Sequence, residues 1–297
     1  MIRIGIIGTE SSHALAFAKY FNLPGNNGEY PFENIRVAAL LGDAQSVDAI
    51  RSAVDIEFVA ERPEDMLGHI DAVMITSRCG SAHYAQLLPL IRSGMPVFID
   101  KPFTSCVQQA QELTALLQQN KNPVVGGSNC KYGEQVQLLK KRVKKLREEQ
   151  KLLSASLNFT LYDSPYDGFW FYAPHLVDIA LEVFGYTPVK VTATSCSGSV
   201  VAVLTYPDVA IALHFTRNLL QGSVTLYTGD DVYHEKLSTN GALAIQAEHF
   251  GNVILGGEQP HTLEQITKHV YVIDELLRSI SDCTRGPLMR CGHRNNP

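Results

Sequence analysis

The stretch Val97-Phe98-Ile99-Asp100-Lys101-Pro102 decides how this chain folds. Its β-branched and aromatic run, preceded by Gly94 and Pro96, is typical of a buried strand. Pro102 removes a backbone donor and restricts Lys101 to extended backbone, so we expect the strand to end with this lysine at its carboxyl edge. Ligands bind at that edge in open α/β sheets, and a desolvated lysine can shift its pKa and transfer protons. A solvated surface lysine beside a turn is the alternative.

Strands and helices alternate on both sides of this stretch. Helical patterns separate apolar runs typical of buried strands, which lie at residues 2–7, 37–41, 56–59, 71–76, 97–101 and 124–126. Such alternation is typical of a parallel, doubly wound sheet with right-handed crossovers. We therefore expect an α/β domain with this sheet at residues 1–127.

The pattern changes at residue 152. Ala155, Leu157 and Phe159 alternate with serine, asparagine and threonine residues, which is the period of a half-exposed strand. Similar segments follow at residues 189–193, 200–205, 209–215 and 223–227. We expect a second domain at residues 128–297, of α+β type, with a mostly antiparallel open sheet.

The composition excludes several classes of partner. A net charge of −5 argues against nucleic-acid binding, and the basic segment 140–145 fits the solvated face of a helix. No apolar run reaches membrane-spanning length, and we expect the chain to start in a strand rather than in a signal peptide. The six cysteines form no close Cys-x-x-Cys pair, and Cys283, Cys291 and His293 lack zinc-site spacing. We expect a cytoplasmic protein with no metal site, no nucleic-acid partner and no membrane segment.

The segment Gly8-Thr9-Glu10-Ser11-Ser12-His13 follows the first strand and precedes a helix. Strand, glycine turn and helix are the context of a dinucleotide-binding fingerprint. Ser11 and Ser12 can cap the helix and offer donors to a pyrophosphate. Against Gly-x-Gly-x-x-Gly, Glu10 takes the second glycine position, where it would repel phosphates, and His13 takes the third. A capped surface turn is the alternative.

Asp43 follows the second expected strand, after Gly42. A carboxylate at that point binds the adenosine ribose hydroxyls and favours NAD over NADP. We therefore expect NAD as the cofactor, with NADP as the second possibility. The alternative for Asp43 is a turn or N-cap residue, because aspartate is common in both.

These features, together with Tyr172-Ala173-Pro174-His175-Leu176-Val177-Asp178, give the chain a resemblance to the Gfo/Idh/MocA oxidoreductase family. Residues 71–83 resemble the family's strand and loop beneath the nicotinamide, and residues 98–102 resemble its Glu-Lys-Pro motif, with Asp100 for glutamate. Residues 256–279 resemble its C-terminal helix signature. The resemblance implies an N-terminal Rossmann domain that binds NAD or NADP, and a C-terminal open-sheet domain that supplies the substrate pocket.

The resemblance also implies roles for single residues. Lys101 matches the proton-handling lysine and His175 the proton-handling histidine, while Asp178, one helical turn on, could orient the ring. Tyr172 is a further catalytic candidate, because Phe171 stands where the family usually carries an aspartate. A buried core histidine and a helix-anchoring acid are the alternatives for His175 and Asp178. The expected cofactor-binding residues are Gly8, Thr9, Ser11, Ser12, His13, Asp43, Thr76, Ser77, His83, Asp100, Lys101 and Pro102.

The resemblance therefore predicts an NAD(P)-dependent oxidoreductase that transfers a hydride to or from a small polyhydroxylated or cyclic substrate. It also implies a homo-oligomer, most simply a dimer, through the C-terminal sheet. The alternatives are a non-catalytic relative with a degraded site, an imine or unsaturated-bond reductase, and a lyase with retained cofactor.

Overall fold

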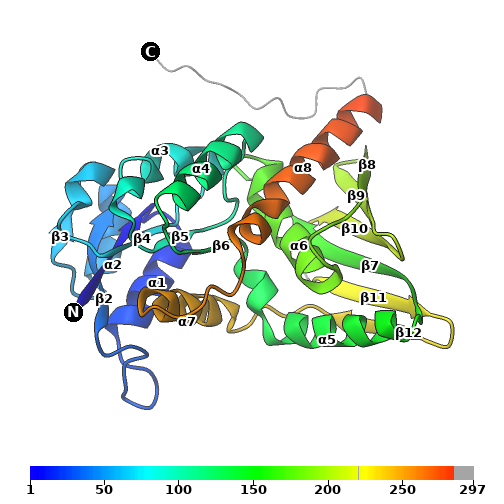
Figure 1. Ribbon diagram of the computed structural model, residues 1–297, viewed down its shortest axis with the longest axis horizontal. Coiled ribbons are helices and arrows are strands. Elements are labelled where there is room, and N and C mark those ends of the chain that lie inside the picture. Colours follow the sequence, from blue (N-terminus) through cyan, green and yellow to red (C-terminus); the bar gives the residue numbers. More distant parts are fainter. Residues whose placement is uncertain (163, 220, 284–297) are drawn as a thin grey trace. The chain divides into compact units, whose positions relative to one another are not determined.

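The computed structural model describes residues 1–162, 164–219 and 221–283 (Figure 1). The chain forms two compact units: Met1–Gly133 with Thr239–Val270, and Glu134–Ser238 with the segment that begins at Tyr271. The sequence predicted one division, after residue 127. In the structure the chain returns to the first unit between Thr239 and Val270, because helix α7 (Ala242–Ile254) contributes Ala247, Phe250 and Val253 to the core of that unit.

The first unit contains a six-stranded sheet with strand order β3-β2-β1-β4-β5-β6. All of its pairs are parallel, which confirms the predicted doubly wound sheet. Its strands are β1 (Ile2–Ile7), β2 (Ile35–Leu41), β3 (Phe58–Val59), β4 (Ala72–Ile75), β5 (Val97–Ile99) and β6 (Val124–Gly126). The strand order reverses between β1 and β4, and ligands bind at such a switch point, beyond the carboxyl ends of the strands.

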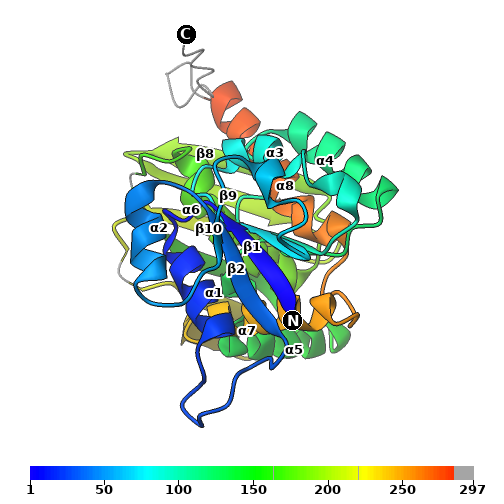
Figure 2. The ribbon, with the colours of Figure 1, turned by 90° about the vertical axis from the view of Figure 1, so that its left-hand side faces the viewer.

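Helices α1 (Ser12–Asn22) and α2 (Ala44–Arg51) follow β1 and β2 (Figure 2). In α1 the buried residues recur at helical spacing, and Phe17 meets Phe98 of β5 edge to face, with ring centroids 5.1 Å apart. Phe250 of α7 packs on the same Phe98 ring at 5.8 Å. The remaining helical segments are η1 (Pro63–Met66), α3 (Gly80–Leu87), η2 (Ile91–Ser93), α4 (Val107–Gln119) and η3 (Asn129–Tyr132).

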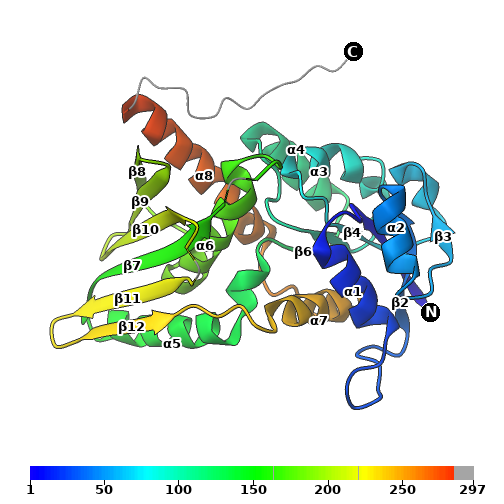
Figure 3. The same cartoon turned by 180° about the vertical axis from the view of Figure 1, so that it is seen from behind.

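The second unit contains a mixed sheet with strand order β12-β11-β7-β10-β9-β8 (Figure 3). Its strands are β7 (Leu152–Leu161), β8 (Lys190–Cys196), β9 (Ser199–Thr205), β10 (Ala210–Arg217), β11 (Ser223–Thr228) and β12 (Val232–Lys236). Strands β7 and β10 pair in parallel and the other neighbours pair antiparallel, as the sequence predicted for most of this sheet. Its helices are α5 (Glu134–Glu148), α6 (Phe169–Phe184) and the C-terminal part of α8 (Leu263–Cys283).

Side chains alternate between the two faces of this sheet. In β9, Val200, Ala202 and Leu204 are buried, whereas Val201 and Val203 are partly exposed. Strand β8 is an edge strand, and helix α8 covers this edge. The backbone N–H groups of Val191 and Ala193 in β8 donate to the side chains of Glu275 and Ser279 in α8. Satisfying the donors of an edge strand prevents unwanted pairing there. Among the described residues, no helix is long and apolar enough to cross a membrane.

Candidate active site

The glycine turn after β1 lies against the loop after β4. Gly8 has φ +94°, and a Cβ at this position would lie 2.2 Å from the backbone nitrogen of Ser77. The hydroxyl of Thr76 donates to the carbonyls of Ile7 and Gly8 at 3.1 and 3.0 Å. Only glycine fits a position with this φ and this close approach. The ends of β1 and β4 are thereby held together at the switch point.

Helix α1 begins directly after this turn. Ser11 is its N-cap, and its hydroxyl accepts from the backbone N–H of His13 at 3.2 Å, while Ser12 is exposed in the first turn. The carboxylate of Glu10 accepts from the backbone N–H of Arg78 at 2.9 Å. Glu10 therefore has a partner in the β4 loop, which the sequence did not predict. The positive φ of Gly8, the close β4 loop and the start of an eleven-residue helix fit a dinucleotide pyrophosphate.

Asp43 is exposed at the end of β2 and is the N-cap of α2. Its Oδ1 accepts from the backbone N–H of Ser46 at 3.0 Å, and hydrogen bonds from Ser46 hold the pKa of this carboxyl below its usual range. Thr9 is buried, and its hydroxyl lies 2.7 Å from that of Ser46. The N-cap interpretation of Asp43 thus describes its protein contacts, and its exposed carboxylate remains a candidate for ribose binding.

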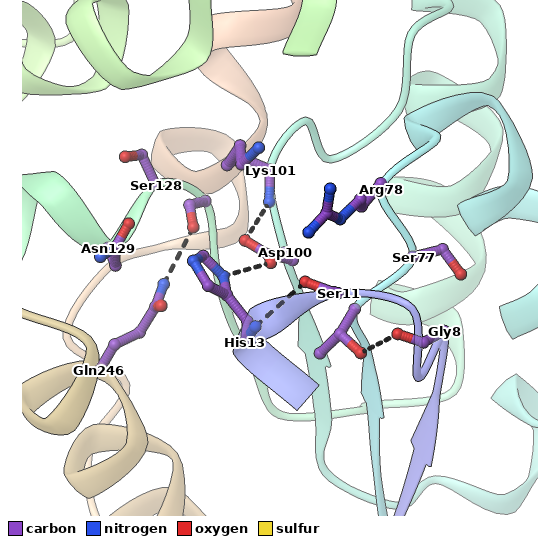
Figure 4. A network of polar contacts seen from close by, with 12 residues as sticks. Gly8, Ser11, His13, Ser77, Arg78, Asp100, Lys101, Ser128, Asn129 and Gln246 are labelled. Carbon is purple, nitrogen blue, oxygen red and sulfur yellow. Dashed lines mark hydrogen bonds and ion pairs between the residues drawn. The ribbon is translucent and has the colours of Figure 1, made fainter. Parts of the chain in front are cut away.

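The buried Asp100 at the end of β5 pairs with the partly exposed His13 in the first turn of α1 (Figure 4). His13 Nδ1 lies 2.6 Å from Asp100 Oδ2, and Asp100 is 2% exposed. Burial alone would raise the pKa of Asp100, but the charge and hydrogen bond of His13, together with Lys101, lower it to about 2. The other carboxylate oxygen accepts from the backbone N–H of Lys101 at 2.7 Å. Asp100 is therefore ionised and fixed in orientation.

Lys101 is 5% exposed, so the alternative of a solvated surface lysine is wrong. Burial lowers the pKa of Lys101, and the charge of Asp100 offsets part of that shift. Pro102 follows through a cis peptide bond and packs on Gly80, where a Cβ would lie 2.2 Å from the proline ring. The start of α3 is thereby fixed against the lysine segment.

His83 is completely buried in α3. Its Nε2 lies 2.8 Å from the carbonyl of Ser77 and its Nδ1 lies 3.3 Å from that of Phe103, and burial lowers the pKa of this histidine. The hydroxyl of Ser77 is hydrogen bonded to Gln86. His83 therefore links two loops of the site, and its expected contact with the cofactor remains a prediction.

Several polar residues near Lys101 were not predicted from the sequence. Figure 4 places Arg78, Ser128, Asn129 and Gln246 around Asp100 and Lys101. Gln246, on α7, is completely buried, and its amide donates to the carbonyl of Gly127 at 2.9 Å. Residues 127–129 follow β6, so their place at the carboxyl edge could have been predicted from the strand order. Gln246 carries no comparable local signal.

The other catalytic candidates lie on α6 in the second unit. His175 is half-buried, and its ring centroid lies 5.8 Å from that of Phe159 and 6.4 Å from that of Tyr172. Asp178 is completely buried one helical turn further on. Because His175 is only half-buried, it is not one of the fully enclosed residues of the core.

The aromatic segment before His175 is divided between core and surface. Phe169 is buried and meets Phe215 at a centroid distance of 5.1 Å. Phe171 is half-buried and contacts the rings of Tyr166 and Tyr172 at 5.7 and 4.8 Å. Phe171 therefore presents part of an apolar ring where the family pattern has a carboxylate.

The described residues contain no cluster of His, Cys, Asp or Glu side chains suited to a metal ion. Cys291 and His293 lie outside the described residues, as does the side chain of Cys283. The expectation about these three residues remains a prediction.

Comparison with known families finds a match for the N-terminal part of the chain. Residues 2–128 match the Gfo/Idh/MocA family, described as an oxidoreductase family with an NAD-binding Rossmann fold. This Rossmann domain belongs to the Gfo/Idh/MocA family. The match ends just after β6, and it includes Gly8, Asp43 and Lys101. A comparison with curated protein sequences finds no match.

Solved structures share the fold of this chain along nearly its whole length. Myo-inositol 2-dehydrogenase from Lactobacillus plantarum is 16% identical, with a TM-score of 0.79 over 95% of this chain and 98% of that chain. Scyllo-inositol dehydrogenase from Lactobacillus casei is 13% identical, with a TM-score of 0.77 over 95% and 97%. An oxidoreductase from Agrobacterium radiobacter in complex with NAD+, L-tartaric acid and magnesium is 12% identical, with a TM-score of 0.74 over 95% and 97%. At these identities the likeness establishes the fold alone.

Proposed function

We propose that this protein is an NAD(P)-dependent dehydrogenase or reductase that acts on a small polyhydroxylated or cyclic substrate. Lys101 carries the proposal, because it is a buried lysine of lowered pKa at the carboxyl edge of an NAD-binding Rossmann sheet. When bound, the nicotinamide accepts or supplies a hydride. The inositol dehydrogenases among the structures of the same fold support the polyol class of substrate.

Lys101 takes or gives the hydroxyl proton in this proposal. A general acid or base works best when its pKa lies near the working pH, and burial moves the pKa of Lys101 down from 10.5. His175 is the second proton-handling residue that we propose, with Asp178 as its positioning residue and Tyr172 as a further donor. Phe171 cannot transfer a proton, so the carboxylate of the family pattern has no counterpart at that position.

The proposed cofactor is NAD, with NADP as the second possibility. The exposed, ionised carboxylate of Asp43 at the end of β2 supports binding of the ribose hydroxyls. The pyrophosphate would lie at the start of α1, beside Gly8, Ser11 and Ser12, where backbone N–H groups favour anions. His13, in the first turn of α1, pairs with Asp100, which precedes Lys101 at the end of β5.

We also propose a cytoplasmic homo-oligomer with no nucleic-acid partner. In the described part of the chain, Cys79, Cys106, Cys130 and Cys196 form no disulfide, which fits a reducing compartment. The partly exposed valines of β9 support association through the mixed sheet.

The decisive experiment is a screen of sugars, inositols and their keto forms with NAD+, NADP+, NADH and NADPH, followed at the nicotinamide absorbance band. Thermal protection by each cofactor is measured in parallel, because a bound ligand raises the melting temperature. We expect protection by NADH and turnover of a polyol or its ketone. Thermal protection by a cofactor without turnover of any compound in the screen would favour the alternative of a non-catalytic relative. The apolar ring of Phe171 is the feature of the site that supports this alternative. The absence of both protection and turnover would overturn the proposal.

A further inference from the structure

His13 and Asp100 are two departures from the family pattern, and they contact each other. His13 stands where the glycine fingerprint has its third glycine, and Asp100 stands where the family motif has glutamate. Their side chains lie 2.6 Å apart although the residues are 87 positions apart in the sequence. A glycine at position 13 would leave the Asp100 carboxylate without this partner.

The contact fixes the position of the hydrogen. The pKa of Asp100 is about 2, so the carboxylate is ionised and can only accept. His13 Nδ1 therefore carries the N–H and donates it to Oδ2. Oδ1 accepts from the Lys101 backbone, so the carboxylate is held between the histidine and the lysine segment.

The charged and titratable groups around the pair are few among the described residues. Asp100 interacts electrostatically with His13, Lys101 and the buried His83, and Lys101 interacts with Asp100, Cys130 and Arg78. Glu10 is in the same turn as His13, but its carboxylate is hydrogen bonded to the backbone of Arg78. The Asp100 carboxylate is thus the group through which His13 can act on Lys101.

We propose that His13 is a positioning residue, which acts through the Asp100 carboxylate to set the charge beside Lys101. The negative charge of Asp100 favours the protonated form of Lys101, and the His13 donor offsets part of that charge. His13 therefore keeps the pKa of Lys101 lower than Asp100 alone would allow. The importance of this effect for turnover rests on the proposed function.

The two partners must then have opposite effects on Lys101. In His13→Phe an aromatic ring remains but the donor is lost, so the pKa of Lys101 should rise. Asp100 should stay ionised in this variant, because the backbone N–H and the charge of Lys101 remain. In Asp100→Asn the negative charge is lost, and the pKa of Lys101 should fall. His13→Asn retains a donor near the Nδ1 position. The pKa of Lys101 in this variant should therefore lie between its values in the wild type and in His13→Phe.

The experiment is an NMR titration of the Lys101 side chain in protein with isotope-labelled lysine, with the signal assigned from Lys101→Arg. His69→Phe is the matched control, because His69 is an exposed histidine that stacks on Phe58 in the same unit, and it should leave the titration unchanged. If His13→Phe does not fold, His13→Ser, which suits a first helical turn, takes its place. An unchanged or lower pKa of Lys101 in the His13 variant would overturn the inference. The titration needs neither cofactor nor substrate, so its outcome is independent of the screen that tests the proposed function.

Discussion

The backbone N–H of Arg78 donates a 2.9 Å hydrogen bond to the carboxylate of Glu10. Glu10 occupies the second glycine position of the fingerprint, yet its charged group is tied to the loop after β4. The residue therefore has two separable properties, a charge near the expected phosphates and an anchor between two loops.

Glu10→Gln should tighten NADH binding, because it removes the charge and retains an oxygen that can accept from Arg78. A charge near a helix N-terminus contributes about 0.3–1 kcal/mol, which corresponds to about two- to fivefold in Kd. Glu10→Gly should also tighten binding, but by less, because it loses the anchor as well. Calorimetric titration at low and high salt measures both effects, and salt should reduce the gain of the glutamine variant. Unchanged affinity in both variants at low salt would place the carboxylate away from the phosphates.

Wild-type protein should bind NADH more tightly than NADPH, because Asp43 is exposed and ionised at the end of β2. Asp43→Asn keeps an N-cap for α2 and removes the charge, so its preference for NADH should weaken. Both affinities follow from the quenching of protein fluorescence or from calorimetry. NADPH binding about tenfold more tightly to the wild type would contradict this assignment.

The sequence predicts the sheet of the first unit and the place of Lys101 for a common physical reason. Buried parallel strands are short apolar runs, and Pro102 and Gly8 mark the ends of two of them. Strand ends lie at one edge of a parallel sheet, so Thr76 after β4 and Asp100 after β5 lie at the same edge. Hydrogen bonds from Thr76 to Gly8 and from Lys101 to Asp100 are found at this edge.

Contacts between distant segments could not be predicted in the same way. The apolar stripe of α7 indicates a buried face but not which surface covers it, and Phe250 packs on Phe98 of β5. The direction of the Glu10 side chain depends on the approach of the β4 loop, which has no local signal. The partial exposure of Phe171 depends on the neighbouring Tyr166 and Tyr172 rings.

Lys101→Met should raise the melting temperature at pH 7, although it should abolish turnover. The pKa of Lys101 is lowered in the folded protein, so its charged form is less favourable there than in the unfolded chain. This cost is fully present below the folded pKa, and it disappears as the pH rises through that value toward the unfolded value of 10.5. The difference between variant and wild type should therefore shrink from pH 7 to pH 10. Lys141→Met, at an exposed position on α5, is the control and should show no such pH dependence.

A lower melting temperature for Lys101→Met at pH 7 would mean that its neighbours stabilise the ammonium beyond its cost of burial. The direction of the pKa shift would then be wrong.

The mixed sheet should form the interface of a homodimer. Val203 lies on the partly exposed face of β9, opposite Ala212 of β10 and Thr192 of β8. Val203→Arg places a charge at the centre of this face, so the mass from light scattering should fall to that of a monomer. Leu138→Arg adds the same charge to an exposed position on α5 and should leave the mass unchanged. A monomeric wild type at micromolar concentration would contradict the proposed assembly.

His175→Ala separates a catalytic histidine from a packed one, once the screen has found a substrate. His175 is half-buried among Phe159 and Tyr172, so its loss should lower the rate by about 10²–10⁴ and change the melting temperature little. Tyr172→Phe keeps the ring contacts and removes the hydroxyl, so a fall in its rate would assign part of the proton transfer to Tyr172. Phe171→Asp restores the carboxylate of the family pattern, and a faster rate would show that the ring limits turnover. A His175→Ala variant with full rate and a lowered melting temperature would identify His175 as a packing residue and leave the proton to Lys101.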